Sequence, residues 1–401
     1  MSDSTDKRRR SGRRRAGDGE SAGAPAPQAR EVALITCPHC EMSVPAGEFC
    51  GHCGAHLTIS SVSRRHAFAA VPSESVGHLS IISTLFPHLP HRQGGAFRWA
   101  LIAGGAVVVI AAGLRLYAPA TAAAAILLPA LYLLYLYEVE VYEDEPWLVV
   151  GATMVAGAVL GYVFTAWTGG AVSRLNLTGY NRSAFVLAGV VVPIAAQALM
   201  LAGPLFLFRF RSRFREPLDG LTFGAASALG FTFASTLVTF WSIISGPLVG
   251  SDRPIEWALP LLRASILVPL VNASTTAIVT ASVWLYRYDR RLPKSSWQAS
   301  VKATLAVAFG SQVLIGMLSF VVPEGLTQVA IWALASIALL LFMRLVIHQV
   351  LLAEGSVHEI GPEAACPECH RIVPTMLFCP ACGVARAAAT KPARVQVEGS
   401  S

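Results

Sequence analysis

Residues 184–208 form the sequence AFVLAGVVVPIAAQALMLAGPLFLF, which contains no Asp, Glu, His, Lys or Arg. A helix needs about 20 predominantly apolar residues to cross a bilayer, so this stretch predicts a transmembrane helix. The rest of the chain repeats the pattern. Seven further apolar runs lie at residues 97–117, 119–137, 147–167, 221–245, 255–285, 301–321 and 326–352.

The composition supports the same fold class. Hydrophobic residues make up 54% of the chain and charged residues 14%, whereas a soluble chain carries about 25% charged residues. The mean hydropathy is +0.55. We therefore predict an all-α polytopic membrane protein with about eight transmembrane helices and small soluble ends. The sixth helix should be tilted or broken, because Pro260 and Pro269 lie inside it.

The loops between the apolar runs predict the orientation. Residues 209–215, after the fourth run, carry four arginines, and residues 287–294, after the sixth, carry three arginines and a lysine. Residues 323–325, after the seventh, carry no positive charge. Basic loops stay on the cytoplasmic side of a membrane. The pattern predicts a multi-pass protein of the cell (inner or plasma) membrane with both termini in the cytoplasm.

All eight cysteines lie in two quartets with the same spacing, CPxC, nine residues and CxxC. The first quartet is Cys37, Cys40, Cys50 and Cys53, and the second is Cys366, Cys369, Cys379 and Cys382. Glycine follows each last cysteine, at Gly54 and Gly383, where it suits a tight turn.

Each quartet has the ligands of a zinc site. Four cysteine thiolates complete the tetrahedral coordination of Zn²⁺ and leave no open position, so such a site is structural. Thiolate ligands also indicate a reducing compartment, since paired cysteines in an oxidising one form disulfides. We predict two structural zinc ions, one in each quartet; paired redox thiols are the alternative.

The quartets are also similar in sequence. Val44-Pro45 in the first matches Val373-Pro374 in the second, and Phe49 matches Phe378. Each copy resembles the zinc ribbon of double zinc ribbon proteins, in which two such modules pack together. The resemblance implies zinc and names no partner. Whether the two ribbons of this chain meet on the cytoplasmic face is a hypothesis at this point.

These features divide the chain into seven segments. They are a disordered basic tail (1–35), a zinc ribbon (36–58), a linker (59–95), a transmembrane helical domain (96–352), a second linker (353–365), a second zinc ribbon (366–384) and a disordered tail (385–401).

The middle of the membrane domain carries a second resemblance. Asp219-Gly220-Leu221-Thr222-Phe223-Gly224, followed by Gly230-Phe231, is similar to the PrsW family of intramembrane proteases, which has a DG-x-x-(Y/F)-G segment and a GF-x-x-x-EN helix. The similarity covers about residues 97–290. The small residues of this segment, Gly224 and Gly230 among them, are themselves expected to form a close-packing face. The resemblance implies a site built from a Glu-Glu pair with a lysine, the Glu of GF-x-x-x-EN and a histidine.

This sequence departs from the family at each of these positions. The Glu-Glu pair falls on Ala196 and Gln197, and the lysine falls on Met200. The Glu-Asn pair falls on Ser235 and Thr236, and the histidine position is closest to Asn272. Without a carboxylate or an imidazole at these positions, a general base cannot be built there. We therefore predict no catalytic residues and a degenerate, non-proteolytic relative.

Several polar residues remain inside the apolar runs. Gln197, Ser235, Thr236, Arg263 and Asn272 could line a polar cavity, although Ser and Thr in membrane helices also bond their own backbone. Arg263 lies well inside its span, where a charge faces the interior of the bundle or reaches the interface. Asn272 or Thr275 is its expected partner.

Three classes of function fit the sequence. The first is a non-catalytic PrsW-like scaffold or regulatory protein whose ribbons bind a cytoplasmic protein partner. The others are an active PrsW-like intramembrane metalloprotease and a transporter or lipid-handling protein. The arginines of residues 1–15 could contact anionic lipid, and a nucleic-acid partner is not favoured because aromatic residues do not interleave with them.

Overall fold

The structure is a computed structural model that describes residues 33–38, 42–57, 95–138, 147–176, 182–210, 217–246, 254–286, 299–323, 325–354, 360–366 and 369–384. Several predicted features lie outside these residues. They are Cys40, the basic tail through residue 32, linker residues 58–94, most of the basic loops at 209–215 and 287–294, and the tail from residue 385.

Within the described residues, eight helical segments are long and apolar enough to cross a membrane. They are α3 (Gly95–Gly113), α4 (Tyr117–Glu138), α5 (Trp147–Asn176), the continuous α6 (Arg182–Val186), η2 (Leu187–Val191) and α7 (Val192–Phe208), α8 (Pro217–Thr239), the continuous α10 (Pro254–Leu262), η3 (Arg263–Leu267) and α11 (Val268–Leu285), α12 (Val301–Val321) and α13 (Leu326–Glu354).

These segments confirm the predicted all-α membrane fold and its eight helices. Two helix ends differ most from the prediction. Helix α5 continues to Asn176, nine residues beyond the predicted end at residue 167, and α8 ends at Thr239 before a short α9 (Trp241–Ile244). Hydropathy sets where a span lies, whereas the hydrogen bonds of the last turns set where its helix ends.

The fourth and sixth spans each contain a π-helical turn directly ahead of a Val-Pro pair. The amide of Val192 donates to the carbonyl of Leu187, five residues earlier, and the amide of Val268 donates to the carbonyl of Arg263. Proline lacks an amide hydrogen and crowds the carbonyl one turn before it, so an α-helix must adjust there. The break expected in the sixth span is thus a widened turn inside a continuous helix.

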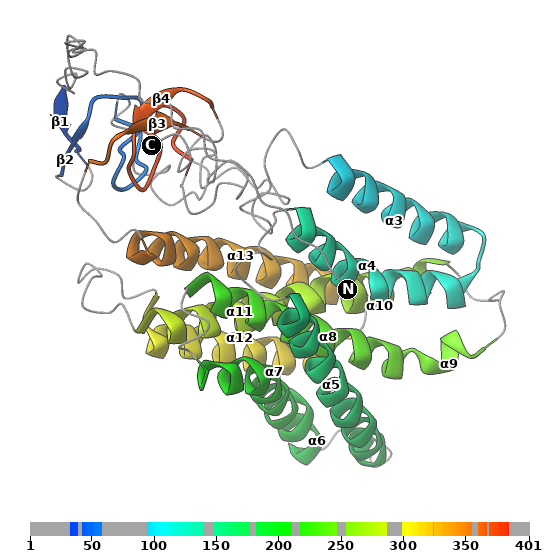
Figure 1. Ribbon diagram of the computed structural model, residues 1–401. Coiled ribbons are helices and arrows are strands. Elements are labelled where there is room, and N and C mark those ends of the chain that lie inside the picture. The colour runs from blue at the N-terminus through cyan, green and yellow to red at the C-terminus, as the bar shows by residue number, and fades with distance from the viewer. Residues whose placement is uncertain are drawn as a thin grey trace, which may run out of the picture. The chain divides into compact units, whose positions relative to one another are not determined.

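Helix α8 is the centre of the helical domain and packs against α5 and α11 (Figure 1). Of the residues in its most apolar window, 72% are buried, against 6% for α3. A Cβ atom on Gly230 would collide with the backbone carbonyl of Met154 in α5, and one on Gly224 would collide with Thr280 in α11. Small residues let membrane helices approach this closely. The close-packing role predicted for Gly224 and Gly230 is therefore confirmed.

Each cysteine quartet is accompanied by a small antiparallel hairpin. Strand β1 (Leu34–Thr36) pairs with β2 (Ser43–Pro45) in the first, and β3 (Glu363–Ala365) pairs with β4 (Ile372–Pro374) in the second. The registers are equivalent, with Ile35 opposite Val44 and Ala364 opposite Val373. Both hairpins begin before the first cysteine of their quartet, at Leu34 and at Glu363.

Candidate metal centres and intramembrane site

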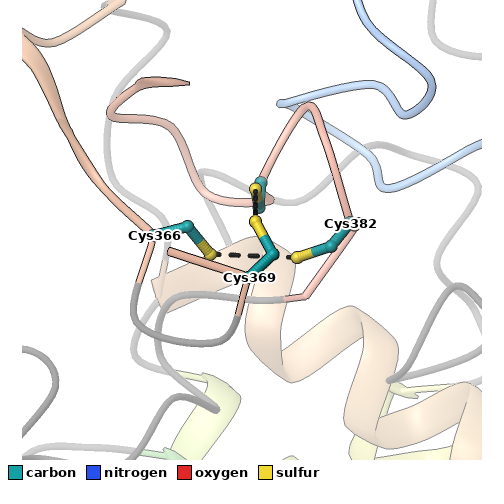
Figure 2. Close-up of side chains that lie close together, drawn as sticks. Cys366, Cys369 and Cys382 are labelled. Carbon is teal, nitrogen blue, oxygen red and sulfur yellow. Dashed lines mark hydrogen bonds between the residues drawn. The ribbon is translucent and has the colours of Figure 1, made fainter. Parts of the chain in front are cut away.

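The second quartet forms a compact cluster of sulfur atoms. The ligand atoms of Cys366, Cys369, Cys379 and Cys382 all lie within 4.8 Å of one another. Figure 2 shows the sulfurs of Cys366, Cys369 and Cys382 turned toward a common centre. The Cys366 and Cys382 sulfurs are 3.8 Å apart, and those of Cys369 and Cys379 are 3.9 Å apart. A tetrahedron with Zn–S bonds of about 2.3 Å has edges of about 3.8 Å, so the spacing fits zinc.

The thiols of this cluster strongly affect one another. Hydrogen bonds from Cys366 and Cys382 lower the pKa of the Cys379 thiol from 9.0 to about 3. The same close contacts, with Cys366 and then Cys379, raise the pKa of the Cys382 thiol. Ionisation of Cys379 to a thiolate is thus favoured, and ionisation of Cys382 beside it is disfavoured. A divalent cation at the centre removes this opposition, because it supplies the positive charge that several adjacent thiolates need.

The first quartet is arranged in the same way. The ligand atoms of Cys37, Cys50 and Cys53 lie within 4.8 Å of one another. The Cys37 and Cys53 sulfurs are 3.8 Å apart, and the amide of Cys53 points to the Cys50 sulfur at 3.4 Å. Cys40, the fourth predicted ligand, lies outside the described residues. These three sulfur atoms are arranged as one face of a tetrahedron.

The backbone of each quartet shows why glycine follows its last cysteine. Gly54 and Gly383 have φ angles of +74° and +75°, in the left-handed region where glycine is favoured. The amide of Gly54 donates to the carbonyl of Cys50 at 2.9 Å, and the amide of Gly383 donates to that of Cys379 at 2.7 Å. These turns bring the last cysteine back toward the first pair.

The two ribbons contact each other through a reciprocal pair of backbone hydrogen bonds. The amide of Phe49 donates to the carbonyl of Pro380 at 3.0 Å, and the amide of Phe378 donates to the carbonyl of Gly51 at 2.8 Å. Phe49 and Phe378 occupy the same position of the repeat, as do Gly51 and Pro380. The two bonds are therefore one contact made twice, as across a local two-fold axis. The hypothesis that the ribbons meet is consistent with this contact.

Inside the membrane domain, six buried polar side chains from four helices form a hydrogen-bonded group that we call the amide network. Its members are Gln197 of α7, Thr232 of α8, Asn272, Thr275 and Thr276 of α11, and Gln312 of α12.

The amide of Gln312 joins the network across three helices. Its nitrogen donates to Asn272 Oδ1 at 2.8 Å and to Gln197 Oε1 at 3.2 Å. The hydroxyl of Thr275 donates to Gln197 Oε1 at 2.9 Å. The nitrogen of Asn272 donates to Thr232 Oγ1 at 3.0 Å, which connects α8. All of these groups are neutral and hydrogen-bonded, which satisfies polar atoms that lipid could not solvate.

The other predicted polar residues lie in different surroundings. Ser235 accepts a hydrogen bond of 2.8 Å from Thr165 of α5. The Thr236 hydroxyl is 3.4 Å from the carbonyl of Ala264, in the π-helical turn of the sixth span. The Arg263 guanidinium donates to the side-chain oxygen of Gln328 in α13. Gln328, rather than the expected Asn272 or Thr275, is thus the partner that the structure shows for Arg263.

Comparison with known proteins identifies the family of this chain. Residues 145–347, slightly more than half of the chain, match the PrsW family intramembrane metalloproteases. The chain belongs to the PrsW family. No curated protein sequence and no solved structure shows a significant match to it. The PrsW match covers the helices from α5 to most of α13, and it includes every member of the amide network.

The residues at the expected PrsW catalytic positions do not fit a catalytic metal. Zinc sites in proteins use thiolate, imidazole or carboxylate ligands, whereas Gln197 and Asn272 offer neutral amide oxygens that already accept hydrogen bonds. Met200, at the lysine position, is fully buried in an apolar cluster with Ala228 and Phe231. The structure thus brings two of these positions together through Gln312, without charge.

Sequence reasoning missed Gln312 and Gln328. Each is a polar amide inside an apolar run, in the seventh and eighth spans. Both lie beyond residues 97–290, the segment that the PrsW resemblance covers. A scan of every span for amides, in addition to charged residues, would have found them, since polar groups at such depth require partners.

Proposed function

We propose that this chain is a non-catalytic member of the PrsW family that acts as a membrane scaffold or regulatory protein. The amide network carries this proposal. Water activation needs a group that takes up a proton near neutral pH, which carboxylates and imidazoles do and amides do not. Gln197 and Asn272 therefore support helix packing where a protease would hold its reacting groups.

The energetics of the network favour a structural role. Each amide is buried, with Gln197 fully inaccessible and Gln312 7% exposed. An amide left without partners in such surroundings costs about 1–3 kcal/mol. The bonds from Gln312 to α7 and α11 avoid this cost and fix how the three helices are rotated against one another. A satisfied network of this kind specifies one arrangement of the helices.

The two quartets are proposed to hold one structural zinc ion each. The ligands are Cys37, Cys40, Cys50 and Cys53 in the first ribbon and Cys366, Cys369, Cys379 and Cys382 in the second. Sulfur separations of 3.8–3.9 Å support this assignment. In its described residues each ribbon has two three-residue strands, and modules of this size need a metal to stay folded.

The ribbons are also the proposed contact with a cytoplasmic protein partner. Both lie at the ends of a domain with an even number of predicted crossings, which supports one common side. That side is the cytoplasm if the basic loops obey the positive-inside rule. Leu34 on β1 and Ile372 on β4 are 54% and 71% exposed and offer apolar area to such a partner.

A cleavage assay tests the absence of catalysis. The purified chain is placed in proteoliposomes with membrane-anchored reporter peptides, beside a PrsW relative that keeps the Glu-Glu, Glu-Asn and His residues. We expect cleavage by the relative and none by this chain, either wild type or Gln197→Leu. Metal-dependent cleavage by the wild type would overturn the proposal, and its persistence in the double variant Cys37→Ser/Cys366→Ser would place the catalytic metal outside the ribbons.

A further inference from the structure

We propose that the two ribbons form a metal-dependent clasp, in which metal binding at one quartet stabilises the other and holds the two ends of the chain together. The proposal rests on the zinc assignment made above and goes beyond it. Two independent zinc ribbons would bind their metals without influence on each other. The contacts between these ribbons indicate that the two sites are coupled.

The coupling follows from where the contacts lie. Each acceptor carbonyl belongs to a residue inside a CxxC turn, since Gly51 lies between Cys50 and Cys53, and Pro380 lies between Cys379 and Cys382. Each donor amide belongs to the phenylalanine directly before such a turn. The metal fixes the shape of these turns. Losing the metal from one quartet therefore displaces one donor and one acceptor, and it weakens both hydrogen bonds.

Side-chain packing reinforces these hydrogen bonds. A Cβ atom on Gly47 would lie 2.6 Å from the Pro380 carbonyl oxygen, and one on Gly54 would lie 3.0 Å from the ring of Phe378. Met376 packs against the core of the first ribbon, and its side chain fills the space beside Gly51. Phe378 is completely buried. The close backbone approach at Gly47 and the packing of Met376 depend on the partner ribbon being folded, whereas Phe378 also belongs to the hydrophobic cluster of the helical domain.

The arrangement has a consequence for the membrane domain. The first ribbon precedes α3 and the second follows α13, so the clasp closes the chain into a loop that contains all the spans. Closing a long loop removes freedom from the unfolded chain, and it does so only while both metals are bound. The clasp thereby connects metal occupancy to the stability of the membrane domain.

Chelator titration of the full-length protein in detergent tests the coupling. Zinc release is followed against a colorimetric chelator for wild type, Cys366→Ser, Cys37→Ser and Gly47→Val. The first quartet should bind zinc about tenfold or more weakly in Cys366→Ser, and the second equally so in Cys37→Ser, as expected for two lost hydrogen bonds and their packing. Gly47→Val, which removes no ligand, should weaken both sites.

The matched control is Ser43→Val, an exposed position on β2 whose counterpart in the second ribbon is Ile372. It should leave both affinities unchanged. The clasp is wrong if the intact quartet of each cysteine variant, and both quartets of Gly47→Val, bind zinc with the wild-type affinity. The zinc assignment would still stand in that case. If wild type holds no zinc at all, the zinc assignment itself fails, and the clasp fails with it.

A cross-link distinguishes a clasp within one chain from an exchange between two chains. A photoreactive benzoylphenylalanine at Met376 should cross-link to residues 47–51 and give a product that runs as a monomer. Products that run only as dimers would show that each ribbon pairs with a second copy, which would overturn the intramolecular clasp.

Discussion

The side-chain nitrogen of Gln312 donates a 2.8 Å hydrogen bond to the side-chain oxygen of Asn272, and this bond joins α12 to α11 inside the membrane domain. The same nitrogen also donates to the side-chain oxygen of Gln197, which links α12 to α7. One side-chain amide thus links buried polar atoms of three helices.

Replacement of Gln312 by leucine should lower the stability of the domain. Asn272 Oδ1 loses its donor, whereas Gln197 Oε1 keeps the hydrogen bond from Thr275. A buried polar atom left unsatisfied costs about 1–3 kcal/mol. Thermal unfolding in detergent, followed by circular dichroism, should show a lower midpoint. The matched control is Ser311→Ala, because the Ser311 hydroxyl donates to Ala308 in its own helix. Equal midpoints for Gln312→Leu and Ser311→Ala would contradict the structural role of the network.

Gly230→Ala should also destabilise the protein, by separating α5 from α8. The added methyl group would meet the backbone carbonyl of Met154, which cannot move aside as a side chain can. Overpacking of this kind costs about 1–3 kcal/mol. Gly151→Ala on α5 is the control, since a Cβ there has no atom within 4 Å. The prediction fails if both variants unfold at the wild-type temperature.

Elemental analysis of the purified chain, with no chelator present, should give about two zinc ions per molecule. Cys37→Ser should reduce the value to about one, because the second quartet keeps its four ligands. Cys366→Ser should do the same. A wild-type value of one, lost completely in either variant, would mean that both quartets share a single ion, and the model of two sites would be wrong.

Epitope tags at the two ends of the chain should have the same accessibility. Eight crossings return the chain to the side on which it began, and the basic loops predict that this side is the cytoplasm. In spheroplasts or intact cells, both tags should bind antibody only after the membrane is permeabilised. One accessible and one protected tag would require an odd number of crossings, which a contact between the ribbons of one chain does not allow.

The sequence predicts the helices well because lipid allows few alternatives. Each apolar run must form a helix to satisfy its backbone, so residues 301–321 were assigned with the bounds of α12. The quartets were equally clear, because four thiolates at CxxC spacing specify a metal without knowledge of distant residues. That Gln197 and Asn272 stand at positions where the family has catalytic residues stays a prediction.

Partners across the fold could not be predicted in this way. Whether Asn272 meets Arg263 or Gln312 depends on how each helix is rotated, and a single sequence with uniformly apolar spans does not reveal that rotation. Arg263 was expected to pair within its own helix region, whereas its partner Gln328 comes from α13. The contact between Phe49 and Pro380 likewise joins segments that the whole membrane domain separates in sequence.

The π-helical turns at Leu187–Val191 and Arg263–Leu267 determine which way the following helices face. One residue corresponds to about 100° of rotation in an α-helix. Deleting one residue from either turn, and so restoring a regular α-helix, would swing Gln197 or Asn272 away from Gln312 while leaving the apolar composition unchanged. The polar interior of this domain therefore depends on chain length within these two turns as much as on residue identity.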